Sequence, residues 1–168
     1  DGATRIGDRC FIMGQCHVGH DCVIDDEVIL SNCALISGHT HIGSGAVISG
    51  PVGVHQFVRI GRLSMLAAFA GVGQDVPPFM VVEGHRPPFI RTLNAVGLKR
   101  AGISSDSRME LRRTFRALYR SGKPVNEAVA ELHEQHLGPE ARELVDFYQP
   151  SKRGITPFLP YRSRRAPE

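Results

Sequence analysis

The sequence contains no tryptophan and only 3 tyrosines, and aromatic residues make up 7% of its 168 residues. Because no aromatic platform accompanies the basic residues, nucleic-acid bases have nothing to stack on, and nucleic acid is not expected as a partner. No apolar run approaches the roughly 20 residues of a membrane-spanning helix, so no transmembrane segment is expected.

Cysteine is also scarce, and its spacing excludes the usual metal-binding frameworks. The four cysteines are Cys10, Cys16, Cys22 and Cys33. The first three lie six residues apart, which matches no zinc-finger spacing. Since no secretion signal is recognisable, we expect a cytoplasmic protein with reduced thiols that serve as small packing residues.

The formal net charge of +3 conceals a division between the two halves of the chain. Residues 1–80 contain 4 Lys and Arg against 7 Asp and Glu, whereas residues 81–168 contain 16 against 10. Such a basic second half suits an anionic surface or a phosphorylated molecule, or is simply a solvated helical surface.

A repeat of six residues dominates the first half. Every sixth residue from Ile6 is aliphatic, namely Ile6, Ile12, Val18, Ile24, Leu30, Ile36, Ile42, Ile48, Val54, Ile60, Leu66 and Val72. Neither a helical period nor strand alternation produces this pattern. It predicts a parallel β-helix over residues 1–80, in which short strands point their aliphatic residue inward on successive walls.

The repeat is expected to end at two proline pairs, Pro77-Pro78 and Pro87-Pro88, which cannot continue a ladder of backbone donors. Residues 81–168 then read as a small helical domain with a basic, proline-rich and frayed tail. Ser107 and Glu110 have the spacing of a capping box, Asn126 is placed to cap a second helix, and Pro139 suits the first turn of a third.

If three hexads make one coil, residues 18 apart lie above one another. His20, Gly38 and Gln56 then form one outward column, and His39 and His55 occupy the columns on either side of it. Such a histidine cluster suits general base catalysis. His20 could serve as the base with Asp21 as its orienting carboxylate, and the side-chain-free Gly38 would offer its N–H to an oxyanion.

The hexad pattern resembles the hexapeptide-repeat acyltransferases, and that resemblance implies a left-handed β-helix. The same fold carries zinc-dependent carbonic anhydrases, which bind metal through three histidines shared between subunits. Such a site also needs a histidine five residues after His55, and this chain has Ile60 there. We therefore expect no metal. Twelve hexads make only four coils, which is a short prism, so we also expect further coils to precede Asp1.

A more specific resemblance rests on five motifs, which are CHVGHDCVI, LISGHTHIG, GVHQFVRIG, GVGQDVPPFMVVEG and LNAVGLKRAGIS. In this order they are similar to the acyl-[acyl-carrier-protein]–UDP-N-acetylglucosamine O-acyltransferases of bacterial lipid A synthesis, over roughly residues 5–157. The resemblance implies a homotrimer that transfers an (R)-3-hydroxyacyl group from acyl carrier protein to UDP-N-acetylglucosamine. It implies no cofactor beyond the phosphopantetheine of the carrier protein.

The resemblance also assigns roles to individual residues. His20 matches the family's general base, Asp21 the adjacent carboxylate and Gly38 the oxyanion donor. His17, His39, His55 and Gln56 match positions that line the substrate cleft. Asn94 and Arg100 match positions that contact the nucleotide from the neighbouring subunit.

Ala68 matches the position that sets acyl-chain length, where glycine leaves room for a longer chain; we therefore expect an intermediate or shorter acyl group. Ala95, Val96 and Ala101 depart from the family pattern near the nucleotide. An acyltransferase acting on an amino sugar nucleotide therefore remains an alternative. A second alternative is a non-catalytic module that trimerises or binds carrier protein, for which the basic half is suited.

Overall fold

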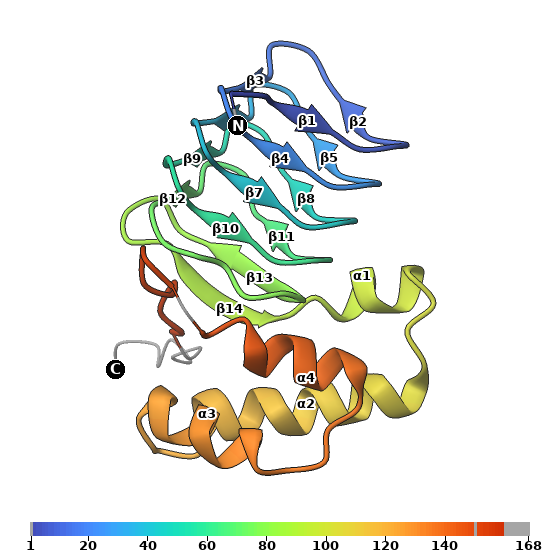
Figure 1. Cartoon of the computed structure of the whole chain (residues 1–168), viewed down its shortest axis with the longest axis vertical. Coiled ribbons are helices and arrows are strands. Elements are labelled where there is room, and N and C mark those ends of the chain that lie inside the picture. The colour runs from blue at the N-terminus through green and yellow to red at the C-terminus, as the bar shows by residue number, and fades with distance from the viewer. Residues whose placement is uncertain (1, 150, 160–168) are drawn as a thin grey trace, which may run out of the picture.

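The protein forms a three-walled prism of stacked strands above a layer of helices, as the computed structural model shows (Figure 1). The structure describes residues 2–149 and 151–159. Within these residues, no helix combines the length and apolarity needed to cross a membrane.

Each wall of the prism is built from parallel two-residue strands, and two longer strands extend the second wall. The first wall contains β1 (Arg5–Ile6), β4 (Val23–Ile24), β7 (His41–Ile42) and β10 (Arg59–Ile60). The second contains β2 (Phe11–Ile12), β5 (Ile29–Leu30), β8 (Val47–Ile48), β11 (Met65–Leu66), β13 (Met80–Glu83) and β14 (Phe89–Leu93). The third contains β3 (His17–Val18), β6 (Leu35–Ile36), β9 (Gly53–Val54) and β12 (Gly71–Val72).

The register confirms the stacking expected from the hexads. Ile6 pairs with Ile24, and Ile24 pairs with Ile42, so residues one coil apart lie above one another. The inward aliphatics from Ile24 onward are at most 2% exposed, whereas Ile6 at the end of the prism is 48% exposed. Burying such a side chain stabilises the fold by about 1.5–3 kcal/mol, so the stacked columns supply the core. The expected fold class, a left-handed parallel β-helix followed by a small α-helical domain, is confirmed.

The corners between walls share one unusual backbone conformation. The third residue after an inward aliphatic has a positive φ at most corners, including Asp21 (58°), His39 (57°) and Phe57 (65°). This left-handed region is strained for residues other than glycine. The corners are held by hydrogen bonds to the next coil, so side chains at these positions project from a fixed backbone.

The sheet continues past the point where the repeat was expected to end. β13 pairs in parallel with β11, and β14 then folds back antiparallel to β13, so the second wall reaches Leu93. The proline pairs lie outside these strands, which leaves the ladder donors intact. Helical structure therefore begins at Ala95 rather than at residue 81.

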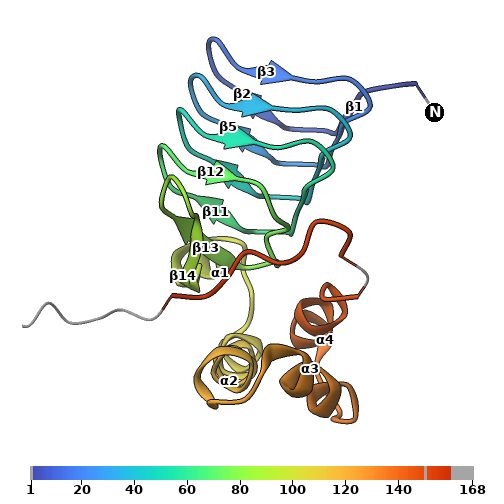
Figure 2. The ribbon, with the colours of Figure 1, turned by 90° about the vertical axis from the view of Figure 1, so that its left-hand side faces the viewer.

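The helices are α1 (Ala95–Arg100), α2 (Ser105–Arg120), α3 (Val125–His133) and α4 (Pro139–Asp146). Helices α2, α3 and α4 pack below the prism, where Figure 2 shows them nearly end-on, whereas α1 lies beside the second wall (Figure 1). The predicted start of α4 at Pro139 is confirmed.

Both predicted helix caps are wrong. Ser104, not Ser107, caps α2 by accepting a hydrogen bond from the Ser107 N–H. Glu110 instead accepts from the N–H of Gly138, at the start of α4. Asn126 lies inside α3, whose N-cap is Pro124. In both cases the observed cap lies within three residues of the predicted one.

The tail from Ser151 to Leu159 is ordered, contrary to the expected fraying. It returns to the β-helix, where Ile155 forms a β-bridge with Asp75 and Phe158 one with Ile90. Asp75, only 1% exposed, accepts hydrogen bonds from Arg59 Nε and from the Ser151 hydroxyl, both at 2.8 Å. This buried carboxylate therefore ties the last coil to the tail. Residues 160–168 lie outside the described part.

Candidate active site

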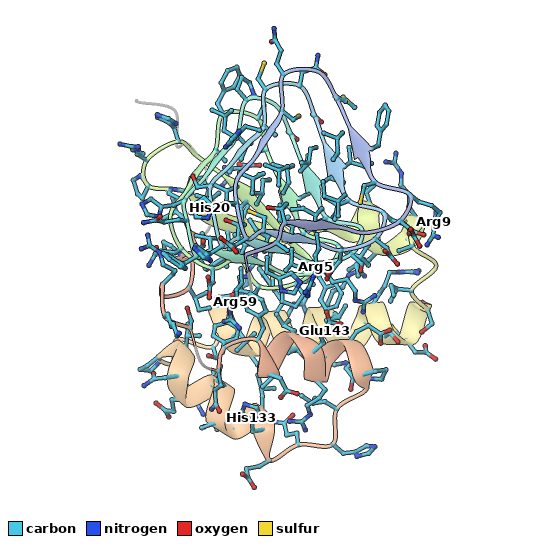
Figure 3. All side chains as sticks on the ribbon, turned by 45° about the horizontal axis from the view of Figure 1, so that its top comes forward. Arg5, Arg9, His20, Arg59, His133 and Glu143 are labelled. Atoms are coloured by element: carbon cyan, nitrogen blue, oxygen red, sulfur yellow. The ribbon has the colours of Figure 1, made fainter. Side chains whose placement is uncertain are left out.

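His20 lies on the prism edge between the third and first walls, well away from Arg9 on another edge (Figure 3). The corners of successive coils stack here, with the His39 N–H donating to the His20 carbonyl at 3.0 Å. The Phe57 N–H donates in the same way to the carbonyl of Gly38 at 3.2 Å. The predicted columns therefore exist, and His20, Asp21, Gly38 and His39 come together.

His20 is oriented by the carboxylate that follows it. Its Nδ1 lies 2.7 Å from Oδ2 of Asp21, whose side chain is 22% exposed. The hydrogen bond from His20 and the nearby His39 lower the pKa of the Asp21 carboxyl, which stays ionised near neutral pH. An ionised carboxylate favours the tautomer with the proton on Nδ1, which leaves Nε2 of His20 free to accept one.

Gly38 faces that free nitrogen. A Cβ added to Gly38 would lie 2.8 Å from Nε2 of His20, so a side chain there would require the His20 ring to move. Among the described residues, no acceptor bonds the Gly38 N–H. The Gly38 N–H is therefore an unused donor on a residue that lies close to the His20 ring, and a base with an oxyanion donor nearby is suited to acyl transfer.

Replacing Gly38 by alanine should displace the His20 ring while keeping the backbone N–H. We expect kcat to fall about 10²-fold, the loss that a misplacement of about 1 Å can cause. Gly14 is the matched control, because it holds the same position on another edge and a Cβ there meets nothing within 4 Å. Steady-state kinetics in which both variants lost activity equally would contradict this steric account.

His39 and Phe57 complete the cluster. The His39 ring stacks on Phe57 at 4.7 Å with an interplanar angle of 9°, and its Nε2 lies 3.8 Å from Oδ2 of Asp21. His20, Asp21 and His39 together offer two ring nitrogens and one carboxylate oxygen within 4.8 Å of one another, so this group could hold a metal ion. The arrangement does not require one for base catalysis.

A groove of about 560 Å³ begins beside the cluster and follows the third wall. His55 and Ser37 line it near the His20 edge, and Phe69 lines it at the far edge. The outward position of two successive strands is glycine, at Gly53 and Gly71, so no side chain fills the groove there.

Three other predicted cleft residues lie around this groove. Ala68 is exposed on the corner next to Phe69, at the far end. His17 is exposed on β3, beside the groove residue Leu35. Gln56 follows His55, and its carbonyl lies 3.2 Å from Nδ1 of that histidine.

Asn94 and Arg100 do not join this cluster within one chain. Both line a second groove, of about 790 Å³, over the second wall and α1. The Asn94 amide caps α1 by accepting from Gly97 and donates to the Leu63 carbonyl, both at 2.9 Å. This groove includes Glu27, which pairs with Arg9 on the edge opposite His20 in Figure 3.

Sequence reasoning missed His85 and Arg86, which come from the β13–β14 loop and close one side of the third-wall groove. The glycine pair 18 residues apart, Gly53 and Gly71, was a readable signal for a groove. No signal in the sequence placed a distant loop beside it.

Known proteins resemble the chain in sequence and in fold. A family model described as UDP-N-acetylglucosamine O-acyltransferase, domain 2, matches residues 75–156, and a bacterial transferase hexapeptide model matches residues 3–38. Two curated relatives are named acyl-[acyl-carrier-protein]–UDP-N-acetylglucosamine O-acyltransferase. The protein from Synechocystis is 45% identical over 148 residues (88% of this chain, 53% of the relative), and that from Burkholderia lata is 42% identical over 159 residues (92% and 60%).

The structural comparison agrees with these matches. The UDP-N-acetylglucosamine acyltransferase from Campylobacter jejuni superimposes with a TM-score of 0.87 at 37% identity, covering 92% of this chain and 60% of that one. The chain thus spans about half the length of the curated relatives it matches. On these matches and on the stacked hexads, the chain belongs to the UDP-N-acetylglucosamine O-acyltransferase family.

Proposed function

We propose that the protein transfers an (R)-3-hydroxyacyl group from acyl carrier protein to the 3-hydroxyl of UDP-N-acetylglucosamine, the first step of lipid A synthesis in the bacterial cytoplasm. The observation that carries this proposal is the arrangement of Asp21, His20 and the unused Gly38 N–H. The family relationship supplies the donor and the acceptor.

In the proposed reaction, Nε2 of His20 takes the proton of the sugar hydroxyl as its oxygen attacks the thioester carbon. Asp21 keeps the opposite proton on Nδ1 and stabilises the imidazolium that forms. The Gly38 N–H donates to the oxyanion of the tetrahedral intermediate. When the intermediate collapses, the carbon–sulfur bond breaks and His20 returns its proton to the leaving thiolate, which gives an ester and a free thiol.

No cofactor takes part in this proposal. The thioester is carried on the phosphopantetheine of the carrier protein, which is part of the substrate, and proton transfer needs only His20. Mildly chelating conditions should therefore leave turnover unchanged.

The third-wall groove is the proposed path of the acyl donor. It is lined mainly by apolar groups and backbone, and it runs from the His20 edge to the corner that carries Ala68. Ala68 is then placed to limit chain length.

Replacing Ala68 by glycine should shift the preferred acyl group toward longer chains, because it removes the methyl group at that corner. The check is a comparison of rates with carrier-protein thioesters of graded length, for wild type and variant side by side. A wild-type preference for the longest chain, or an unchanged profile in the variant, would contradict the assignment.

A homotrimer is part of the proposal, because the parts of the site lie on different edges of one chain. The His20 edge of one protomer would face the second-wall groove of the next, and so meet Asn94 and Arg100 of that neighbour. The Arg100 guanidinium is suited to bind a diphosphate through charge-assisted hydrogen bonds.

Mixed assemblies offer a direct check of this shared site. Protomers with His20→Ala, refolded together with protomers carrying Arg100→Ala, should regain activity above either variant alone, because some interfaces then hold both intact residues. A mixture of His20→Ala with Asp21→Ala is the control, since both changes affect the same edge and no intact site can form. Absence of recovery in the first mixture would contradict a shared site.

The reaction itself is tested by thiol release from hydroxyacyl carrier protein, using the longest form of the protein that its gene encodes. UDP-N-acetylglucosamine, its 3-amino analogue and no acceptor form the three arms. Release that depends on UDP-N-acetylglucosamine supports the proposal, and release only with the amino sugar would shift it to an N-acyltransferase. Salt-sensitive binding of carrier protein without release would indicate a non-catalytic module.

A further inference from the structure

The group formed by His20, Asp21 and His39 has the chemistry of a metal site. It presents three donor atoms of metal-binding type within 4.8 Å of one another, and it is the one such group found in residues 2–149 and 151–159. Two imidazoles and one carboxylate suit zinc and its neighbours in the first transition row, whereas magnesium and calcium prefer oxygen ligands.

Two of the three separations between the donor atoms are close to the one that zinc requires, and all three donors lie within 4.8 Å of one another. The separations from Oδ2 of Asp21 are 2.7 Å to Nδ1 of His20 and 3.8 Å to Nε2 of His39. Ligands bound tetrahedrally at 2.0–2.2 Å lie roughly 3.4 Å apart, so the observed separations bracket the required one. Small side-chain rotations would therefore suffice.

The backbone beneath the donors is fixed. Asp21 and His39 occupy the same left-handed corner position on successive coils, and the His39 N–H bonds the His20 carbonyl. Stacking on Phe57 fixes the plane of the His39 ring. The His20 side chain is 75% exposed, which leaves a fourth ligand position open to water.

We propose that His20, Asp21 and His39 bind one zinc ion, with Nδ1 of His20 as a ligand and the proton of the neutral ring moved from Nδ1 to Nε2. The ion is not a cofactor of the transfer reaction. With that proton on Nε2, His20 has no free lone pair to accept the proton of the sugar hydroxyl, and the ion occupies the carboxylate that would stabilise the imidazolium. Zinc therefore inhibits acyl transfer reversibly, because it occupies the base. This consequence rests on the proposed function.

Binding is measured without reference to activity, by calorimetric titration of the metal-free protein with zinc and by the visible absorption of cobalt as a probe. Wild type should bind one equivalent. His39→Gln removes one ligand and should weaken binding at least tenfold, since loss of even an outer-shell partner costs about 10–100-fold. His41→Gln is the matched control, because His41 belongs to an exposed pair with Asp25 that has no third ligand within the described residues.

Two results would overturn the site. The first is the absence of saturable binding in wild type, and the second is equal affinity in wild type and His39→Gln. Inhibition is then assayed at zinc concentrations that saturate the site and is reversed with a chelator. Full turnover by zinc-saturated protein would disprove the competition with the base, whereas a protein that binds zinc but never turns over would count against the proposed function alone.

Discussion

Replacing His20 by alanine should lower turnover by 10²–10⁴-fold or more, the range that general base catalysis contributes. The loss should fall on kcat, because the imidazole acts on the proton that moves in the transition state. Steady-state rates with hydroxyacyl carrier protein and UDP-N-acetylglucosamine measure it.

The control for this change is His41→Ala, which removes the same type of residue from the first wall. His41 pairs with Asp25 at 3.0 Å and contacts neither His20 nor Gly38, so its loss should change turnover little. Near-normal turnover in His20→Ala would rule out His20 as the base, and an equal loss in both variants would point to damage to the fold.

Replacing Asp75 by alanine should destabilise the protein by about 3–5 kcal/mol, the usual cost of removing one partner from a buried ion pair. The carboxylate is 1% exposed, and it accepts from the backbone N–H and Nε of Arg59 and from the Ser151 hydroxyl. Its removal leaves these donors without their acceptor and loosens the tail from the last coil.

Denaturant unfolding at fixed protein concentration measures this loss, because the stability of an oligomer depends on concentration. Asp25→Ala is the matched control: its carboxylate is 36% exposed in an ion pair with His41, and such surface pairs contribute about 0–1 kcal/mol. Equal shifts of the unfolding midpoint in the two variants would contradict the role given to Asp75.

The hexads made most of the β-helix predictable. An inward aliphatic at every sixth position leaves one arrangement that buries all of these side chains. Stacking residues 18 apart then predicts, from the sequence alone, that His20, Gly38 and His39 lie together. Local sequence therefore determined this part of the site, because each coil repeats the one before it.

Features that depend on contacts between distant segments were not predictable in the same way. The return of the tail to Asp75 joins residues 76 apart in sequence, and no local pattern marks it. The predicted cap at Ser107 was wrong for a different reason: Ser104 has the same side chain three residues earlier and caps α2, and Glu110 bonds Gly138 instead of closing a capping box. Asn94 and Arg100 line the second-wall groove, away from His20, and only the proposed homotrimer would bring them to the His20 edge of a neighbour.

The measurement that tests the central claim most directly is the mass of UDP-N-acetylglucosamine after incubation with hydroxyacyl carrier protein and the longest form of the protein that its gene encodes. The account predicts a gain of one hydroxyacyl group with wild type and none above background with His20→Ala. An unchanged nucleotide mass with every acyl length offered, or an equal gain with the variant, would contradict it.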